Sequence, residues 1–402
     1  MSAGSNQDHG AGAILPGATL GVMGGGQLGR MFVHAAQQMG YFTAVLDPDV
    51  GSPAGLVSHH HIKTGYLDAE GLAQLTACSA AITTEFENVP AAALETLAVH
   101  RPVAPGASAV AIAQDRALEK AHFKKCGVAC APHAVIETQQ QLDAIGDTLL
   151  PGILKTTRMG YDGKGQVRVA TRQALAEAWQ QLGRVSCVLE KMLPLAAECS
   201  VIVARGRDGQ MVDFPVQLNL HRDGILAVTQ VYEGHVPAAL GAQLVAAARS
   251  IAQGLGYVGV LCVEFFILEG GAWVVNEMAP RPHNSGHYTM DACDVSQFDL
   301  QVRTLAGLPL TQPRQHSPAL MLNLLGDIWF APNGMRAQAS AEAMTPPWGE
   351  LLTLPGVHLH LYGKLQAREG RKMGHLNITS ATVVGARATA ARAAALLGIA
   401  AF

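Results

Sequence analysis

Two glutamates on neighbouring predicted strands are the residues whose chemistry the sequence states most directly. Residues 258–268 and 272–278 are β-rich runs, and Gly270-Gly271 between them favours a two-residue hairpin turn. Pairing about this turn places Leu268 opposite Trp273, Phe266 opposite Val275, and Glu264 opposite Glu277. Opposed like charges repel at about 4.5–5.5 Å between Cβ atoms, so the two carboxylates require a cation. Carboxylate oxygens select magnesium, which keeps waters and takes further ligands from substrate phosphates. The alternative, a solvated hairpin face, is disfavoured by the apolar residues between the glutamates and the turn.

A lysine followed by a glycine-rich loop forms a second candidate site. Lys155 closes a predicted strand over residues 152–155, and Gly160, Gly163 and Gly165 follow at spacings typical of a flexible flap. A lysine beside a mobile glycine loop is suited to holding the phosphates of a nucleotide. An ordinary hairpin loop is the alternative, and the Walker A pattern is absent from the sequence.

The second of the two predicted strands that carry the paired glutamates runs directly into a loop dense in polar donors, residues 276–287. Arg281 offers a planar fork suited to a carboxylate or to bicarbonate. His283 and Asn284 are suited to positioning or deprotonating a small substrate. This loop is therefore expected to carry chemistry beside the metal site.

A glycine turn near the N-terminus has a less specific signature. Gly24, Gly26 and Gly29 satisfy G-x-G-x-x-G between a predicted strand and helix, and Asp47 lies where a dinucleotide fold keeps its ribose-binding acid. Taken alone, the turn suggests an NAD enzyme. Backbone N–H groups at a helix N-terminus bind any phosphate, however, and a tight turn without a ligand is equally open.

The elements around these residues predict an α/β protein of several domains. Strands over 18–23, 42–46 and 80–84, with a helix over 27–39 that stops at Gly40, form a Rossmann-like parallel sheet. The stretch 115–125 is helical and charged, and 150–310 is richer in strands. A proline-containing link, 308–318, introduces the last region. We expect boundaries at residues 1–14 (a disordered extension), 15–120, 121–311 and 312–402.

Composition excludes several classes of function. The chain has 402 residues, is 49% hydrophobic and 15% charged, and its net charge is −3, which gives no footprint for nucleic acid or membrane. The seven cysteines show no C-x-x-C pair and are expected to be reduced thiols. The first 14 residues lack signal-peptide features, and no apolar run reaches the length of a membrane span. A soluble, cytoplasmic protein is expected.

Five stretches of the chain together resemble one family. They are residues 25–31 (GGQLGRM), 85–90 (EFENVP), 160–166, 277–287 and 374–377 (GHLN). In this order they resemble the ATP-grasp superfamily and, within it, the N5-carboxyaminoimidazole ribonucleotide synthetases of purine biosynthesis. The likeness extends from about Thr19 to Thr379. It implies an ATP-grasp fold: an N-terminal Rossmann-like domain, a central α+β ATP-grasp domain, and a small C-terminal domain that holds the substrate phosphate.

The resemblance also implies a reaction and a set of site residues. ATP phosphorylates bicarbonate to carboxyphosphate, whose carboxyl group reaches the exocyclic amine of 5-aminoimidazole ribonucleotide, and ADP and phosphate leave. ATP binding is assigned to Arg116, Lys155, Gly160, Tyr161, Asp162, Gly163, Lys164, Gly165, Gln166, Glu190, Lys191, Met192, Leu193, Glu198, His221, Asn276 and Glu277. Glu264 and Glu277 match magnesium ligands. The ribonucleotide pocket is assigned to Gln27, Leu28, Glu87, Asn88 and Val89, with Lys364 and Arg371 at its phosphate. Bicarbonate and proton handling falls to Tyr161, Asp162, Arg281, His283 and Asn284.

One position departs from the superfamily's pattern. Many ATP-grasp enzymes carry Glu-x-Asn on the second metal strand, whereas Ala279 stands two residues after Glu277 here. Other readings are a formate-using glycinamide ribonucleotide transformylase, a biotin-carboxylase-like ligase, or a non-catalytic nucleotide sensor. The family further suggests a homodimer.

Overall fold

The chain opens with a parallel sheet of four strands. Residues 12–160, 165–330 and 344–402 are those that this computed structural model describes. In the order β3-β2-β1-β4, the strands are β1 (Thr19–Met23), β2 (Phe42–Leu46), β3 (His60–Ile62) and β4 (Ala81–Thr84). The accompanying helices are α1 (Gln27–Gln38), α2 (Ala69–Cys78), α3 (Ala91–Ala98) and α4 (Ala107–Ala113). The predicted Rossmann-like sheet is confirmed. The first helix ends before Gly40, whose φ of +82° suits the glycine exit.

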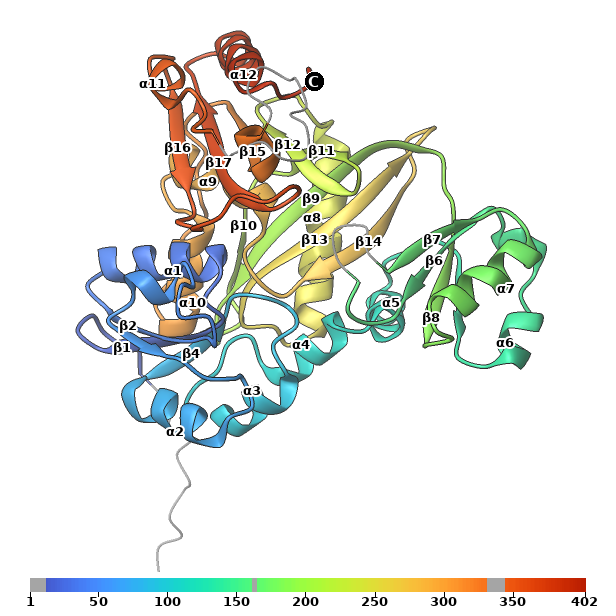
Figure 1. Ribbon diagram of the computed structural model, residues 1–402, viewed down its shortest axis with the longest axis horizontal. Coiled ribbons are helices and arrows are strands. Elements are labelled where there is room, and N and C mark those ends of the chain that lie inside the picture. Colours follow the sequence, from blue (N-terminus) through green and yellow to red (C-terminus); the bar gives the residue numbers. More distant parts are fainter. Residues whose placement is uncertain (1–11, 161–164, 331–343) are drawn as a thin grey trace, which may run out of the picture.

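A second, antiparallel sheet forms a separate lobe, drawn in green in Figure 1. Its order is β5-β8-β6-β7, with strands β5 (His133–Ile136), β6 (Gly152–Thr156), β7 (Gln166–Val169) and β8 (Cys187–Lys191). The helices α6 (Gln139–Asp143) and α7 (Arg172–Gln181) pack on it around a core of its own that includes Leu154, Trp179 and Leu189. We call this sheet and its two helices the small lobe.

The large sheet has nine strands among the residues that the structure describes, and it continues to the C-terminal region. Its path is β14-β13-β9-β11-β12-β15-β17-β16, and β10 pairs with β9 at one side. The strands are β9 (Leu195–Arg205), β10 (Met211–Asp213), β11 (Gln217–Arg222), β12 (Ile225–Val231), β13 (Gly259–Leu268), β14 (Trp273–Ala279), β15 (Ala319–Leu325), β16 (Val357–Leu361) and β17 (Lys372–Thr379). The C-terminal strands therefore do not form a sheet of their own, since β15 pairs with β12.

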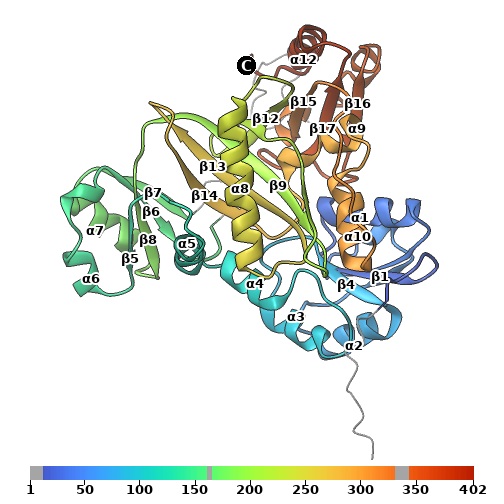
Figure 2. The ribbon, with the colours of Figure 1, turned by 180° about the vertical axis from the view of Figure 1, so that it is seen from behind.

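Helices join these layers. α8 (Ala238–Gly254) lies across one face of the large sheet, as Figure 2 shows, and buries its apolar side against β9 and β13. α10 (Gln297–Ala306) packs between the N-terminal sheet and the large sheet; its N-terminus is closed by a capping box of Ser296 and Asp299. α12 (Val383–Leu397) covers the C-terminal strands, beside the short α11 (Trp348–Leu351). None of the helices in the described residues has the length and hydropathy needed to cross a membrane.

Candidate active site

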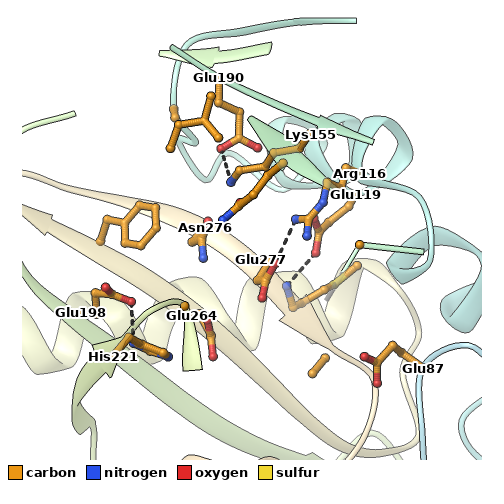
Figure 3. A pocket seen from close by; sticks show the side chains of 18 of the residues that line it. Glu87, Arg116, Glu119, Lys155, Glu190, Glu198, His221, Glu264, Asn276 and Glu277 are labelled. Carbon is orange, nitrogen blue, oxygen red and sulfur yellow. Dashed lines mark hydrogen bonds and ion pairs between the residues drawn. The ribbon is translucent and has the colours of Figure 1, made fainter. Parts of the chain in front are cut away.

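A cavity of about 680 Å³ lies between the small lobe and the large sheet. It receives side chains from both sheets and from α5 (Arg116–Lys125), which connects them (Figure 3). Its lining includes these predicted site residues: Glu87, Asn88, Arg116, Lys155, Gly160, Gln166, Glu190, Lys191, Met192, Leu193, Glu198, His221, Glu264, Asn276, Glu277, Arg281, His283 and Asn284. Residues taken from widely separated sequence motifs thus meet in one space large enough for a nucleotide.

A β-bulge in the hairpin of β13 and β14 shapes the floor of this cavity. Val263 pairs with Met278, but the next recorded pair is Phe265 with Val275. Glu264 therefore faces two residues of β14, Asn276 and Glu277. Because an extra residue reverses the alternation of side chains along a strand, both of them point into the cavity. Without the bulge, Asn276 would face the opposite side of the sheet.

The predicted register of this hairpin is wrong near its turn. Ile267 pairs with Trp273 and Phe266 with Val274, one residue away from the predicted partners. The turn holds three residues rather than two, since the N–H of Leu268 donates to the carbonyl of Ala272 at 2.7 Å. The bulge restores the predicted register beyond Glu264. The two glutamates still meet because the longer turn and the bulge compensate for each other.

The electrostatics of the two glutamates suit a divalent cation. Burial and the neighbouring charge of Glu277 raise the pKa of Glu264 to about 7. Burial would also raise the pKa of Glu277, but the Arg116 charge outweighs it and lowers that pKa below its ordinary value. The side-chain oxygen of Asn276 is buried without a hydrogen-bond partner in the described residues. Two carboxylates and an amide oxygen fit magnesium, although no group of three His, Cys, Asp or Glu in the described residues is arranged to hold a metal.

A buried pair of lysines shares one carboxylate at the small-lobe side of the cavity. Glu190 accepts from Lys155 at 2.9 Å and forms an ion pair with Lys120, also at 2.9 Å, and the three side chains are between 1% and 9% exposed. Burial alone would raise the pKa of Glu190, but the two lysines lower it to about 2. Lys120 was missed by the sequence reasoning. Its only signal was its place one helical turn after Arg116 in a charged helix.

Three residues on one face of α5 connect β14, which carries Glu277, to the small lobe. Arg116 donates to Glu277 at 2.9 Å, and Lys120 reaches Glu190 as described above. Between them, Glu119 accepts from the backbone N–H of Met278 at 2.6 Å. The spacing of three and four residues places all three side chains on one side of the helix. Asp115 caps this helix by accepting from the N–H groups of Ala117 and Leu118.

Glu198 and His221 form a pair at the other end of the cavity. The Nδ1 of His221 lies 2.8 Å from Glu198. A dashed line joins the two side chains in Figure 3. Burial alone would lower the pKa of His221, but the hydrogen bond to Glu198 and the charge of Glu264 raise it above its ordinary value. The structure thus brings together two of the residues expected to bind ATP.

The polar loop after β14 is held by charged partners. The Nε of Arg281 donates to Glu87, and although burial would raise the pKa of Glu87, this arginine lowers it to about 2. The Nδ1 of His283 accepts from the N–H of Ser285 at 3.3 Å, and its Nε2 lies 3.2 Å from Glu264. Burial and the Arg281 charge keep the pKa of His283 well below its ordinary value. His283 is therefore neutral and oriented toward a metal carboxylate.

Asn284 has the least satisfied side chain of this loop. Its amide oxygen and nitrogen are both buried without partners in the described residues, and the residue lines the cavity. A buried amide costs free energy unless it is hydrogen-bonded. Asn284 is thus prepared to bind a small polar molecule.

The glycine turn holds a protein carboxylate rather than offering a free phosphate site. Glu85, which is buried, accepts from the N–H groups of Gly26 at 2.9 Å and Gly29 at 3.1 Å. A Cβ at Gly24 would lie 2.4 Å from the Glu85 side chain. Asp47 in turn accepts from the N–H of Gly25 at 2.7 Å. The glycines therefore make room for Glu85, which the sequence reasoning did not assign to this place.

Several predicted residues lie away from the described cavity lining. The side chains of Leu28 and Val89 are buried in the N-terminal core. Gln27, Gly165, Lys364 and Arg371 are also outside the described lining, whereas Lys372, next to Arg371, belongs to it. Tyr161, Asp162, Gly163 and Lys164 lie outside the described residues.

Comparison with known protein families covers the chain in three parts. Residues 17–114 match the ribonucleotide synthetase preATP-grasp domain, residues 121–298 the ATP-grasp domain, and residues 319–389 the phosphoribosylaminoimidazole carboxylase C-terminal domain. The chain is 42% identical over 371 residues to N5-carboxyaminoimidazole ribonucleotide synthase of Brucella melitensis, with 90% of this chain and 97% of that protein covered.

Solved structures agree with these matches. N5-carboxyaminoimidazole synthetase from Staphylococcus aureus complexed with ADP is similar with a TM-score of 0.85 and 36% identity, over 95% of this chain and 98% of that one. N5-carboxyaminoimidazole synthase from Aspergillus clavatus, in complex with ADP and 5-aminoimidazole ribonucleotide, gives a TM-score of 0.85 and 30% identity, over 94% and 98%.

Proposed function

The chain belongs to the N5-carboxyaminoimidazole ribonucleotide synthase family of ATP-grasp ligases, and from this we infer what its cavity does. It carboxylates 5-aminoimidazole ribonucleotide with bicarbonate at the expense of ATP, in de novo purine biosynthesis. The observation that carries this assignment is the single cavity in which phosphate-binding cations, paired carboxylates and the polar loop 281–284 meet.

The reaction divides into two transfers. A bicarbonate oxygen attacks the γ-phosphorus of ATP, the bond to the β-phosphate oxygen breaks, and carboxyphosphate and ADP form. The exocyclic amine of the ribonucleotide then takes the carboxyl carbon, phosphate leaves with the bonding electrons, and the amine loses a proton. Carboxyphosphate hydrolyses easily in water, so the site must exclude solvent during these steps.

Lys155 and Arg116 supply positive charge to the ATP phosphates. In the structure each is paired with a carboxylate, Glu190 and Glu277 respectively. Binding of the phosphates exchanges these partners for oxygens that carry more charge. The adenine lies beside the hinge of residues 190–193, where Met192 offers an apolar wall. Glu198 takes the ribose hydroxyls beside His221.

Magnesium fits the bulge of β13 and β14, and Glu264, Glu277 and the free oxygen of Asn276 would hold it. When bound, the ion offsets charge on the transferred phosphoryl group. The protein's own part is to present the two carboxylates on opposed strands. The Nε2 of neutral His283 lies 3.2 Å from Glu264, and this contact helps to fix the position of the carboxylate.

The carboxylation step falls to the loop after β14. Arg281, which lines the cavity and pairs with Glu87, binds the bicarbonate charge. The unsatisfied amide of Asn284 fixes the orientation of the small anion. Tyr161 and Asp162, from the lid of residues 160–166, complete the set that handles the proton.

The ribonucleotide lies at the N-terminal side of the cavity. Glu87 and Asn88 line this side and contact its ribose and imidazole. Gln27, Leu28 and Val89 belong to the same pocket by family resemblance. Lys364 and Arg371, which we call the phosphate clamp, bind its phosphate. The protein acts in the cytoplasm as a homodimer, as the family resemblance suggests.

The deciding measurement is ADP release with ATP, magnesium and labelled bicarbonate, with and without the ribonucleotide. Strong stimulation by the ribonucleotide, with label in a carbamate product, is expected. Stimulation by formate with glycinamide ribonucleotide instead would keep the superfamily and overturn the substrate. No stimulation by either substrate pair would favour a nucleotide-binding protein.

A further inference from the structure

The GHLN motif of residues 374–377 lies in β17, away from the cavity lining. His375 and Asn377 are both fully buried and belong to the part of the large sheet between β15 and β16. Gly374 is required there, because a Cβ would stand 2.5 Å from the carbonyl oxygen of His360. Leu376 points to the opposite face and packs in the core under α12. The two polar side chains therefore face the body of the protein.

A column of stacked rings extends from these strands to the polar loop after β14, residues 281–287, which we call the catalytic loop. His360 stacks on His375 at 4.6 Å between ring centroids, and His375 stacks on His287 at 4.5 Å. Phe298 of α10 lies at 5.9 Å on the other side of His287. Burial lowers the pKa of His287 to about 3 and keeps that of His375 well below its ordinary value, so both rings are neutral and stack without repulsion. The column joins the C-terminal strands, the loop and α10.

Asn377 is the hydrogen-bonding link that accompanies this column. Its Nδ2 donates to the backbone carbonyl of His287 at 2.8 Å and to Asp291 at 2.6 Å. Asp291 also faces the Nε2 of His360 at 2.7 Å and the Nδ1 of His358 at 3.5 Å. One amide therefore connects β17, the end of the catalytic loop and α9 (Thr289–Ala292).

The beginning of the loop is held by a second buried amide. Gln297 accepts from the N–H of His283 at 2.9 Å and donates to its carbonyl at 2.8 Å. The same Nε2 lies 3.1 Å from the ring of His287. The loop of residues 283–287 is thus fixed at its first residue by Gln297 and at its last by Asn377.

The residues of the phosphate clamp lie between β16 and β17, the two strands that carry His360, His375 and Asn377. Tyr362 follows β16, and its hydroxyl lies 2.9 Å from the Nδ1 of His375. The ammonium of Lys364 lies 5.7 Å from the centre of the Tyr362 ring and donates to the carbonyl of Lys372. Arg371 immediately precedes β17. The position of the clamp and the position of the catalytic loop are therefore set by the same few contacts.

We propose that Asn377 is a positioning residue that fixes the catalytic loop, with His283 and Asn284, relative to the phosphate clamp. The inference rests on the proposed function, since it concerns the ribonucleotide held between these two groups. The amine must stand at the carboxyl carbon when carboxyphosphate forms, and a small displacement lets water or diffusion consume the intermediate. Loss of the Asn377 link should therefore separate ATP use from carboxylation.

The test compares the carbamate formed per ADP released in the wild type, Asn377→Leu and Asn377→Ser. Both variants lose the two donated hydrogen bonds; the serine is too short to reach either acceptor and keeps the test open if the leucine variant does not fold. We expect ribonucleotide-stimulated ADP release to persist, with the carbamate-to-ADP ratio reduced and the KM for the ribonucleotide raised at least about fivefold. The KM for ATP should stay within about twofold.

Asn323→Leu is the matched control. Asn323 is a buried asparagine on the neighbouring β15 whose Nδ2 donates to the carbonyl of Leu226 at 2.8 Å. It should lower Tm without lowering the carbamate-to-ADP ratio. Asp291→Asn keeps an acceptor for Asn377, and its carbamate-to-ADP ratio should stay close to that of the wild type.

Three outcomes would overturn the inference. Wild-type coupling in both Asn377 variants would show that the link does not position the loop. If Asn323→Leu lowered the carbamate-to-ADP ratio as strongly as Asn377→Ser, sheet stability would be responsible. If Asp291→Asn did so, the Asp291 charge would be responsible. A wild-type protein that forms no carbamate would overturn the proposed function, and this inference with it.

Discussion

Arg116 and Glu277, which are 161 positions apart in the sequence, form an ion pair of 2.9 Å between Nη1 and Oε2. One is expected to bind ATP phosphates and the other magnesium, and in this ion pair each neutralises the charge of the other. Arg116 is 18% exposed and Glu277 41% exposed, which leaves the pair open to exchange with solvent and ligands. Neither charge is therefore left without a partner.

Replacing Arg116 should strengthen metal binding and weaken ATP binding. In Arg116→Met, Mn²⁺ without nucleotide should bind about threefold to tenfold more tightly, because the competing cation on Glu277 is gone. The KM for ATP should rise at least about tenfold, since a phosphate contact is lost. Calorimetric titration and initial rates measure the two effects. Arg172→Met, which breaks an exposed pair with Asp147 in the small lobe, should change neither. Weaker Mn²⁺ binding in Arg116→Met would contradict the exchange.

Metal binding should depend on pH through Glu264. Burial and Glu277 raise the pKa of Glu264 to about 7, so the carboxyl is mostly protonated below that pH and must lose its proton to bind a cation. Affinity for Mn²⁺ without nucleotide should accordingly be about tenfold lower at pH 6 than at pH 8. Glu264→Gln should bind weakly at both values and lose this dependence. A flat wild-type profile between pH 6 and pH 8 would remove Glu264 as the titrating ligand.

The shared carboxylate of Glu190 should stabilise the fold at neutral pH. Its pKa is lowered from 4.5 to about 2 in the folded protein, so its contribution is present above the unfolded value and is lost as pH falls toward 2. Glu190→Gln should reduce the free energy of unfolding at pH 7 by about 3 kcal/mol, and the difference from wild type should shrink below about pH 4.5.

Chemical denaturation at several pH values measures this effect. Glu177→Gln, at an exposed position on α7, should change the unfolding free energy by no more than about 0.5 kcal/mol. A constant difference between wild type and Glu190→Gln from pH 7 to pH 3 would mean that the lysine pair does not act through the ionised carboxylate.

The phosphate clamp can be tested through substrate selectivity. Lys364→Ala should raise the KM for the ribonucleotide by about tenfold or more and leave the KM for ATP nearly unchanged, because only one substrate phosphate is involved. Lys125→Ala, at the exposed end of α5, removes the same charge elsewhere and should affect neither. Equal increases in both Michaelis constants would assign Lys364 to a general structural role.

Sequence periodicity predicted β1, β2 and β4 of the N-terminal sheet, α1, α5 and the hairpin of β13 and β14, because these elements have strong local signals. It did not predict the short β3. Local signals also brought Glu264 and Glu277 together. The bulge was not predictable, since it depends on how the hairpin pairs with β9 and on contacts such as that of Glu119 with the Met278 N–H. Asn276 thus became a cavity residue for reasons that lie outside its own strand.

Residues that act over long distances in the chain were the hardest to assign. Glu85 fills the glycine turn but lies 56 and 59 positions from the glycines that it binds. Because no nearby residue indicated this carboxylate, the pattern of the turn suggested a phosphate. Lys120 and Gln297 hold site residues through buried hydrogen bonds that no short motif encodes. Asn377 was recognisable only as part of a family motif, and the contacts that suggest its role appear once β17 is placed beside the loop.

The continuity of the nine-stranded sheet has a consequence for how the enzyme opens. Because β15 is hydrogen-bonded to β12, the C-terminal strands cannot rotate away from the metal strands as an independent body. The small lobe, with its own sheet and core, is the part left to swing. We therefore expect nucleotide entry and exit to be gated by motion on one side only. The ribonucleotide would meet a surface whose shape is already set before ATP binds.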